Sequence, residues 1–238
     1  MRNALAIGGK EVRTYFSSPM AYVVAAIFLA ATGFFFVQDL AVLQLARLQG
    51  FFGPASFLLL LLCPLLTMRL LAEEQKLGSL ELLLTAPVRD EEVVVGKYIG
   101  ALAMVGAMLA LTLYFPLMLF WFGDPDPGPV LTGYLGIFLL GACFAAAGLF
   151  ASSMTSNQIV AAVIALGFSL LFWLAGTAGS MVQEVPGARD LLQYLTLSTH
   201  YGELVRGVVD VRALIYLLSF VVAALFLTVR SIETKRWR

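Results

Sequence analysis

Long apolar runs without a charged side chain alternate along the chain with short segments that carry almost all of its charge. A membrane-spanning helix needs about 20 predominantly apolar residues, and the runs are too long for the alternating segments of about ten residues that build a membrane barrel. They lie at about 20–38, 52–68, 98–122, 130–152, 157–177 and 213–229. The pattern predicts an all-α polytopic membrane protein, a single domain over residues 1–238 with six transmembrane helices. Pro64 and Pro116 predict kinks.

Composition supports a membrane protein and removes several other classes. Hydrophobic residues make up 61% of the chain and charged residues 13%, whereas soluble domains carry about 25% charged residues. Six spans would leave room only for short connections, which excludes a sizeable aqueous domain. The 15 basic and 15 acidic residues balance, so the basic excess of a nucleic-acid-binding protein is missing and we expect no nucleic-acid partner.

Basic residues gather on one side of the predicted membrane. With six spans both termini lie on the same side, and the side richer in lysine and arginine faces the cytoplasm. The side of the termini carries Arg2, Lys10, Arg13, Arg69, Lys76, Arg89, Lys97, Arg230, Lys235, Arg236 and Arg238, and the other side carries Arg47, Arg189, Arg206 and Arg212. We therefore expect the N- and C-termini in the cytoplasm.

Residues 1–19 precede the first span and are too polar to cross the membrane. Apolar and small residues recur there at helical spacing, opposite a set of charged residues. The first set is Leu5, Gly8, Gly9, Val12, Tyr15 and Phe16, and the second is Arg2, Lys10, Glu11 and Arg13. This pattern predicts an amphipathic helix that lies in the membrane interface and ends at Ser18-Pro19. An ordinary basic anchor that only fixes the orientation is the alternative.

The sequence lacks the residues that intramembrane chemistry needs. The interiors of the spans contain no charged side chain, which argues against a proton pump or an ion-coupled carrier. Cys63 and Cys143 lie in apolar runs and His200 is the only histidine, so we expect no metal site and no catalytic residue. The Gly-Lys pairs at 9–10 and 96–97 lack the other residues of a phosphate-binding loop. We therefore expect no enzyme, and any energy must come from another polypeptide.

Two features of the spans allow more than one interpretation. Gly96 and Gly100 have a spacing that lets two helices pack closely, either within the chain or across a dimer. Phenylalanines gather near the first two spans, at Phe28, Phe34, Phe35, Phe36, Phe51, Phe52 and Phe57. They suit packing or contact with lipid, and the alternative is the wall of a path for a lipid-like substrate.

The charge that the spans avoid is concentrated in residues 72–97, between the second and third spans. Gly78 is placed to end one helix, and Ser79 to cap a new one in which Glu81 lies in the first turn. The new helix would have a leucine-rich side and would end at Pro87. Such a helix on the cytoplasmic surface suits the docking of a soluble partner, although a solvated loop is equally compatible with the pattern.

The same residues resemble the signature of a known family. The order Glu73-x4-Gly78-Ser79-Leu80-Glu81 resembles the Glu-x4-Gly-Thr-x-Glu signature of the membrane permeases of type 2 ABC transporters, with serine in place of threonine. The Leu-Leu-x-x-Pro87 and Gly96-Lys97 that follow are similar to its continuation. Residues 152–165 and 201–231 are similar to the gliding-motility-associated branch of the family. The resemblance covers nearly the whole chain in order.

The resemblance implies an ATP-driven permease. A chain of this family would pair with a second permease chain, identical or related, and would bind two copies of a cytoplasmic ATP-binding subunit. That subunit would carry ATP and Mg, so this chain would bind no cofactor itself. The complex would export a substrate across the plasma membrane of a prokaryote. The alternative is a membrane anchor that transmits ATP-driven movement to an envelope complex without transporting cargo.

In the resembled family the segment between the second and third spans is the coupling helix, which sits in a cleft of the ATPase. Carried over by position, the coupling residues of this chain would be Glu73, Glu74, Gly78, Ser79, Leu80, Glu81 and Pro87. We expect these residues to transmit movement and to carry out no chemistry.

Residues 178–212 separate the last two spans on the opposite side of the predicted membrane. Pro186-Gly187 predicts a turn between two short helices, which are too small for a soluble fold and would lie in or re-enter the outer leaflet. In the resembled family this region caps the external mouth of the pathway. A candidate external gate is formed by His200, Glu203, Arg206, Asp210 and Arg212. A salt-bridged surface hairpin, with His200 as a hydrogen-bonded structural residue, is the alternative.

Overall fold

The computed structural model describes residues 2–43, 48–78, 88–123, 125–181 and 192–236, and these residues contain helices and no strand. The helices are α1 (Arg2–Ser17), α2 (Pro19–Leu43), α3 (Gln49–Thr67), α4 (Arg69–Leu77), α6 (Asp90–Leu111), α7 (Tyr114–Phe122), α8 (Pro127–Met154), α9 (Gln158–Met181), α11 (Leu197–Val205) and α12 (Val211–Arg236). Among them are six segments long and apolar enough to cross a membrane. The predicted all-helical fold with six spans is therefore confirmed.

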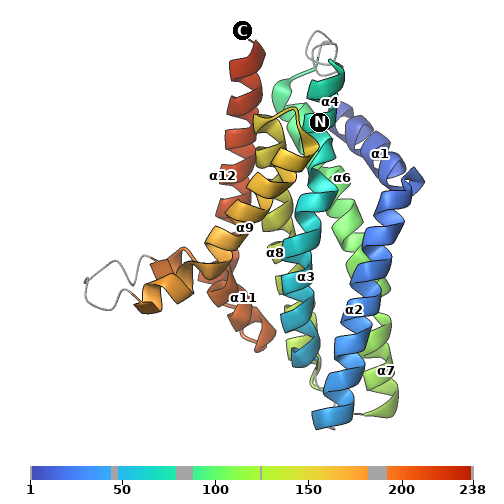
Figure 1. The fold of residues 1–238 in the computed structure, drawn as a ribbon. Coiled ribbons are helices and arrows are strands. Elements are labelled where there is room, and N and C mark those ends of the chain that lie inside the picture. Colours follow the sequence, from blue (N-terminus) through green and yellow to red (C-terminus); the bar gives the residue numbers. More distant parts are fainter. Residues whose placement is uncertain (1, 44–47, 79–87, 124, 182–191, 237–238) are drawn as a thin grey trace.

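Three of the spans extend well beyond the uncharged runs that predicted them. The second, third and last cover Gln49–Leu77, Asp90–Phe122 and Val211–Lys235. Helical hydrogen bonds do not stop where charge begins, so α4 and the start of α6 continue the second and third spans into the charged segment 72–97. Both termini lie toward the same end of the bundle (Figure 1). We call this the termini end, and the other the far end.

Two spans are interrupted near their prolines, as predicted. The second breaks at Met68, one turn after Pro64, where the Met68 N–H still donates to the Pro64 carbonyl oxygen at 2.9 Å. The third breaks between α6 and α7, just before Pro116. Because Pro116 has no N–H, it cannot bond the carbonyl of Thr112 one turn earlier. That carbonyl oxygen accepts instead from the Phe115 N–H and from the hydroxyl of Tyr134 in α8, both at 3.0 Å.

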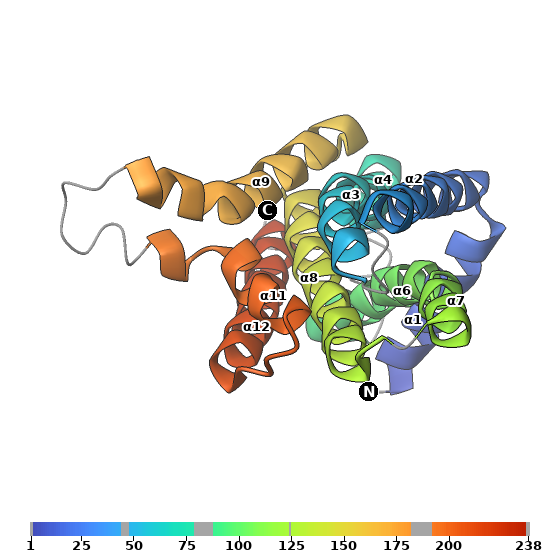
Figure 2. The same ribbon diagram turned by 90° about the horizontal axis from the view of Figure 1, so that it is seen from below.

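Helix α8 occupies the middle of the bundle, between α3, α6, α11 and α12 (Figure 2). Of its most apolar window 78% is buried, against 17% for α9 at the periphery. Small residues let its neighbours come close: a methyl group added at Gly136 would lie 2.9 Å from the Cβ of Leu204 in α11, and one at Gly141 would lie 2.8 Å from Val105 in α6. α8 is therefore the frame on which the other helices are placed.

Helix α1 confirms the predicted amphipathic helix but uses a different face for packing. Leu5 and Phe16, expected on the apolar side, are 66% and 47% exposed, whereas Glu11, expected on the polar side, is buried. The buried face turns toward α6, where Gly96 and Gly100 let the two helices approach closely. This contact settles the role of that glycine pair as packing within the chain, because a methyl group at Gly96 would lie 2.8 Å from the Ala4 carbonyl oxygen.

Aromatic side chains form the core at the far end. Phe51 and Phe52 of α3 pack on Tyr134 of α8 with ring centroids 5.9 and 5.5 Å apart, and Phe36 of α2 packs on Phe115 of α7 at 4.6 Å. Of the phenylalanines singled out from the sequence, Phe28, Phe36, Phe51 and Phe52 are buried, and Phe34, Phe35 and Phe57 are exposed. The buried members therefore have packing roles, and the exposed ones lie on the outer surface of the bundle.

Candidate functional site

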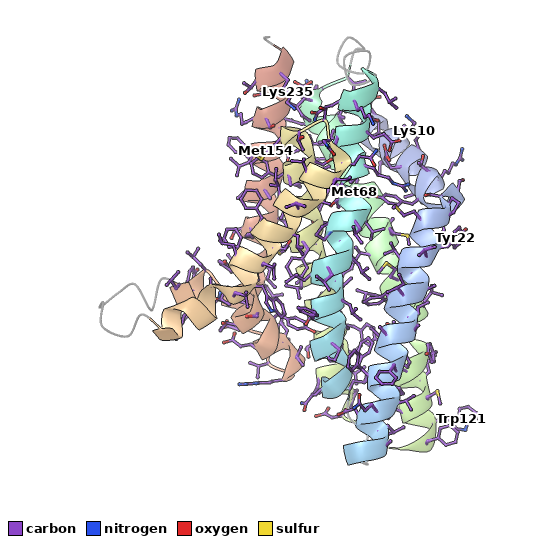
Figure 3. The ribbon with its side chains drawn as sticks, viewed as in Figure 1. Lys10, Tyr22, Met68, Trp121, Met154 and Lys235 are labelled. Atoms are coloured by element: carbon purple, nitrogen blue, oxygen red, sulfur yellow. The ribbon has the colours of Figure 1, made fainter. Side chains whose placement is uncertain are left out.

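The residues predicted to couple the chain to a partner begin in α4, at the termini end. Figure 3 shows Lys10, Met68, Met154 and Lys235 gathered toward that end, with Trp121 at the other. Glu73 and Glu74 lie in α4, and Gly78 ends the helix with a φ of 70°. A left-handed residue of this kind is the usual glycine C-cap, so the predicted helix end at Gly78 is confirmed. Ser79, Leu80, Glu81 and Pro87 lie outside the described residues.

A serine of the central helix holds the start of α4. The Ser152 hydroxyl oxygen accepts hydrogen bonds from the backbone N–H groups of Leu71 and Ala72, at 3.1 and 3.0 Å, and donates to the Met68 carbonyl oxygen at 2.9 Å. The first N–H groups of any helix lack partners within the helix. Ser152 therefore acts as a cap supplied by another helix, and it fixes the break between α3 and α4 onto α8.

The end of α8 is bound in return by α4 and α12. The Gln75 amide donates to the carbonyl oxygens of Ser152 and Ser153 at 3.3 and 3.1 Å. The Lys235 ammonium group donates to the Ser153 carbonyl oxygen at 2.7 Å and to the Gln75 side-chain oxygen at 2.6 Å. The last carbonyl groups of a helix lack internal partners and favour a positive charge. α8 therefore caps the start of α4, and α4 and α12 together cap the end of α8.

A buried ion triad joins α4 to α1 and α6. The Lys97 ammonium group of α6 donates to a Glu11 carboxylate oxygen of α1 at 2.9 Å and lies 2.8 Å from a Glu74 carboxylate oxygen of α4. The side chain of Lys97 is 1% exposed. Buried lysine is rare and requires pairing, and here both partners come from other helices. Glu74, a predicted coupling residue, thus contacts α6 directly and is linked to α1 through the shared ammonium group of Lys97.

Tyr15 and Arg69 make a second connection between α1 and the α3–α4 break. The Tyr15 hydroxyl donates to the Leu66 carbonyl oxygen at 2.8 Å, and the Arg69 guanidinium lies 4.7 Å from the centre of the tyrosine ring. Arg69 also donates to the Ser18 hydroxyl at 2.8 Å. Burial raises the pKa of Tyr15 above its ordinary value, and the charge of Arg69 opposes that rise. Tyr15 therefore stays a neutral hydrogen-bond donor.

A groove of about 260 Å³ separates α1 from α4 at this end. Its walls carry charges of both signs, and they consist of Lys10, Glu11, Thr14, Arg69, Leu70, Glu73, Glu74, Leu77 and Lys97. The described residues contain no group of three His, Cys, Asp or Glu side chains that could hold a metal ion. The arrangement supports mechanical linkage, because α4, which carries the predicted coupling residues Glu73 and Glu74, contacts α1, α6, α8 and α12.

The candidate gate residues lie at the far end and bond mainly to nearby backbone. The His200 ring nitrogen is 3.0 Å from the Tyr194 carbonyl oxygen, and the ring packs on Tyr216 with centroids 4.3 Å apart. Asp210 accepts from the Arg212 backbone N–H at 2.8 Å. In the part of this segment that the structure describes, no ion pair joins Glu203, Arg206, Asp210 and Arg212. The structure gives His200 a hydrogen bond to nearby backbone, and the role of the five residues as an external gate stays a prediction.

The sequence did not predict the contacts that Gln75, Ser152 and Lys235 make between helices, or the two carboxylates that pair with Lys97. The first three are polar residues at helix ends, where their partners are set by tertiary contact. One signal was available: Glu11 and Lys97 each lie close to glycines, Gly8 and Gly96, on helices that would meet at the same side of the membrane. Opposite charges beside small residues on two such helices indicate a close, charge-paired contact.

The six spans and the contacts at the termini end define a class of protein. It is a multi-pass membrane protein in which the end of the second span, α4, is fixed to its neighbouring helices. Within that class, a sequence model of the ABC-2 family transporter proteins matches residues 11–232. The chain therefore belongs to this family and is a membrane-spanning permease component of an ABC transporter, distinct from the ATP-binding subunit with which such permeases associate. A search of curated proteins found no match. The similarity to the gliding-motility branch stays a prediction.

Proposed function

We propose that this chain is the permease subunit of a dimeric ABC exporter in the plasma membrane of a prokaryote, with the termini end in the cytoplasm. Two copies of a separate ATP-binding subunit, which carry ATP and Mg, dock on residues 73–87 of the two permease chains. Family membership and the excess of basic residues beside the termini support this proposal. The second permease chain is a copy of this one or a related chain.

The observation that carries the proposal is the anchoring of α4. A segment that receives a mechanical input must be bonded to the body it moves, because a loop attached only through its own backbone would yield. Three separate contacts meet this requirement immediately before Gly78: Ser152 of α8, Lys235 of α12 and Lys97 of α6. A solvated loop that only neutralises headgroups would need none of them.

ATP binding to the docked subunits biases the permease dimer between two arrangements. A ligand shifts such an equilibrium only through contacts that differ between the two states. The differing contact is the docked segment, and α4 passes its displacement to α8 as a rigid-body movement. This chain supplies binding and transmission, while hydrolysis takes place on the partner.

Glu81→Lys tests the docking assignment. Reversing this charge removes a favourable carboxylate from the first turn of the expected docking helix and places a cation at the contact. We expect the variant to insert into the membrane normally but to lose co-purification of the ATP-binding subunit. Glu233→Lys is the matched control, because it reverses a charge at the same end whose ion pair, in the part of the chain that the structure describes, is with exposed Arg230 of its own helix. Unchanged binding by Glu81→Lys would contradict the assignment.

The composition of the purified complex tests transport against a purely mechanical role. We expect imaging of the detergent-solubilised complex to show two nucleotide-bound subunits beneath residues 73–90. Export then requires a path between the permease chains that opens to the far end. Additional protein chains on the far end, with closed spans, would favour mechanical transmission to external partners and would overturn the export assignment.

A further inference from the structure

The buried ion triad lies where the two ends of the proposed docking segment return to the membrane. Glu74 is one turn before Gly78, at the end of α4, and Lys97 is two turns into α6, where the chain re-enters the bundle. The third member, Glu11, comes from α1, which precedes the first span. The ammonium group of Lys97 therefore connects three helices: α4 before the docking segment, α6 after it, and the N-terminal helix α1.

The energetics of the triad indicate that it fixes the relative position of α1, α4 and α6 more than it adds to the stability of the fold. Moving an ammonium ion out of water costs several kcal/mol, and well-packed apolar side chains of similar volume often serve as well as a buried ion pair. A charge-paired contact has a different property, because its attraction depends on specific atoms meeting. In the arrangement of α1, α4 and α6 seen here, Lys97 reaches both carboxylates, at 2.9 and 2.8 Å, and a displacement of either carboxylate would lengthen one of these contacts.

Helix α1 is bound more closely to α6 than to the span that follows it. The chain leaves helical geometry at Ser18 between α1 and α2, and Figure 1 shows α1 set at an angle to α2. Against α6, by contrast, the backbones approach so closely that a methyl group at Gly100 would lie 2.5 Å from the Cβ of Glu11. Mechanically, α1 belongs with α6.

We propose that Lys97 is a positioning residue for ATPase coupling. By binding Glu11 and Glu74 it holds α1, α4 and α6 as one unit. Displacement of the docked segment then moves α1 as well, and the chain bends at Ser18, between α1 and α2. The proposal rests on the docking of an ATP-binding subunit at residues 73–87, and it adds a residue outside that docking surface whose role is to keep the two ends of the segment in register.

The test is a variant in which the whole triad is neutral: Glu11→Gln, Glu74→Gln and Lys97→Met together. It leaves no unpaired charge buried, so the complex should fold. Because Glu74 also lies in the proposed docking segment, retention of the ATP-binding subunit is measured for Glu74→Gln alone as well, and hydrolysis is compared only per bound subunit. We expect ATP hydrolysis per bound ATP-binding subunit, measured in lipid nanodiscs, to fall about tenfold relative to the unmodified complex, within the range of typical coupling between sites. The double variant Arg230→Gln and Glu233→Gln, which removes an exposed pair, should leave hydrolysis unchanged.

A disulfide between α1 and α6 separates positioning from lost packing. A Cβ added at Gly8 would lie 3.4 Å from the Cβ of Ile99, close to the separation of about 3.5–4.5 Å in disulfides. Gly8→Cys and Ile99→Cys are added to the neutral variant, while native Cys63 and Cys143 stay buried in place. Oxidation should restore the part of the hydrolysis that depends on the link between α1 and α6, and dithiothreitol should remove it again in the same sample.

The possible results distinguish the two proposals. A neutral variant that hydrolyses ATP as fast as the unmodified complex would overturn the role of Lys97 while leaving docking intact. A neutral variant that is uncoupled in both redox states would overturn the linkage through α1. If the unmodified chain does not retain the ATP-binding subunit at all, the proposed function fails, and the role of Lys97 in coupling fails with it.

Discussion

The two ends of the bundle use their charged residues in opposite ways. At the termini end, Lys97 and Lys235 cross between helices to reach partners far away in sequence. At the far end, Asp210 binds the backbone two residues away and Arg206 is exposed. Charges that cross between helices fix the helices relative to one another, whereas charges that bond locally fix only their own turn. Among the described residues, charged contacts between helices are therefore concentrated at the termini end, whereas aromatic packing and the Tyr201 hydrogen bond join the helices at the far end.

Removing the Lys97 ammonium alone should have the largest effect on stability. Lys97→Met leaves Glu11 and Glu74 side by side in a largely buried site without their shared cation, and breaking a buried ion pair in this way costs about 3–5 kcal/mol. We expect a large fall in the thermal unfolding temperature in detergent. Arg230→Gln, which breaks an exposed pair of the same kind, should cost about 0–1 kcal/mol. Equal losses would show that burial does not separate the two pairs.

Removing the Ser152 hydroxyl should have the next largest effect. Ser152→Ala leaves the N–H groups of Leu71 and Ala72 and the carbonyl of Met68 without their partner in a buried place. Each unsatisfied buried group costs about 1–3 kcal/mol, and partial relaxation of the break should limit the total to about 2–3 kcal/mol.

Ser153→Ala is the matched control for Ser152→Ala. The Ser153 hydroxyl donates only to the Phe150 carbonyl oxygen of its own helix, at 2.7 Å. We expect a loss below about 1 kcal/mol, read from the same thermal unfolding curves. A larger loss from Ser153→Ala than from Ser152→Ala would contradict the view that bonds between helices hold the α3–α4 break.

Two tyrosines offer a direct comparison of the ends without charge. Tyr15 donates to the Leu66 carbonyl oxygen at one end of α3, and Tyr201 of α11 donates to the Phe52 carbonyl oxygen at the other, at 2.8 and 2.9 Å. Both tyrosines are buried. We expect Tyr15→Phe and Tyr201→Phe to cost about 1 kcal/mol each in thermal unfolding. A marked difference between them would show that the ends differ in more than their use of charge.

The sequence predicted what depends on local pattern and missed what depends on neighbours. Six uncharged runs gave six spans, because crossing length is a local property, and Gly78 was placed correctly as a helix end. The buried face of α1 was half wrong, since periodicity cannot say that α6 would meet the side of Gly8 and Glu11. Ser152 was missed for the same reason: nothing in its own surroundings indicates that α4 begins beside it. Ser79, Leu80, Glu81 and Pro87 lie outside the described residues, so the docking helix expected there stays a prediction.

The smallest expected effect is that of Arg206→Gln at the far end. The Arg206 side chain is exposed, and the backbone N–H of Arg206 donates to the Glu203 carbonyl oxygen at 3.1 Å, a bond that the substitution leaves in place. Surface changes of this kind usually alter stability by less than about 0.5 kcal/mol, so we expect an unchanged unfolding temperature. If ATP hydrolysis by the complex nevertheless changes, Arg206 acts in the gate and not in the fold. If stability falls, its charge has a partner at this end, and the contrast between the two ends is smaller than the contacts indicate.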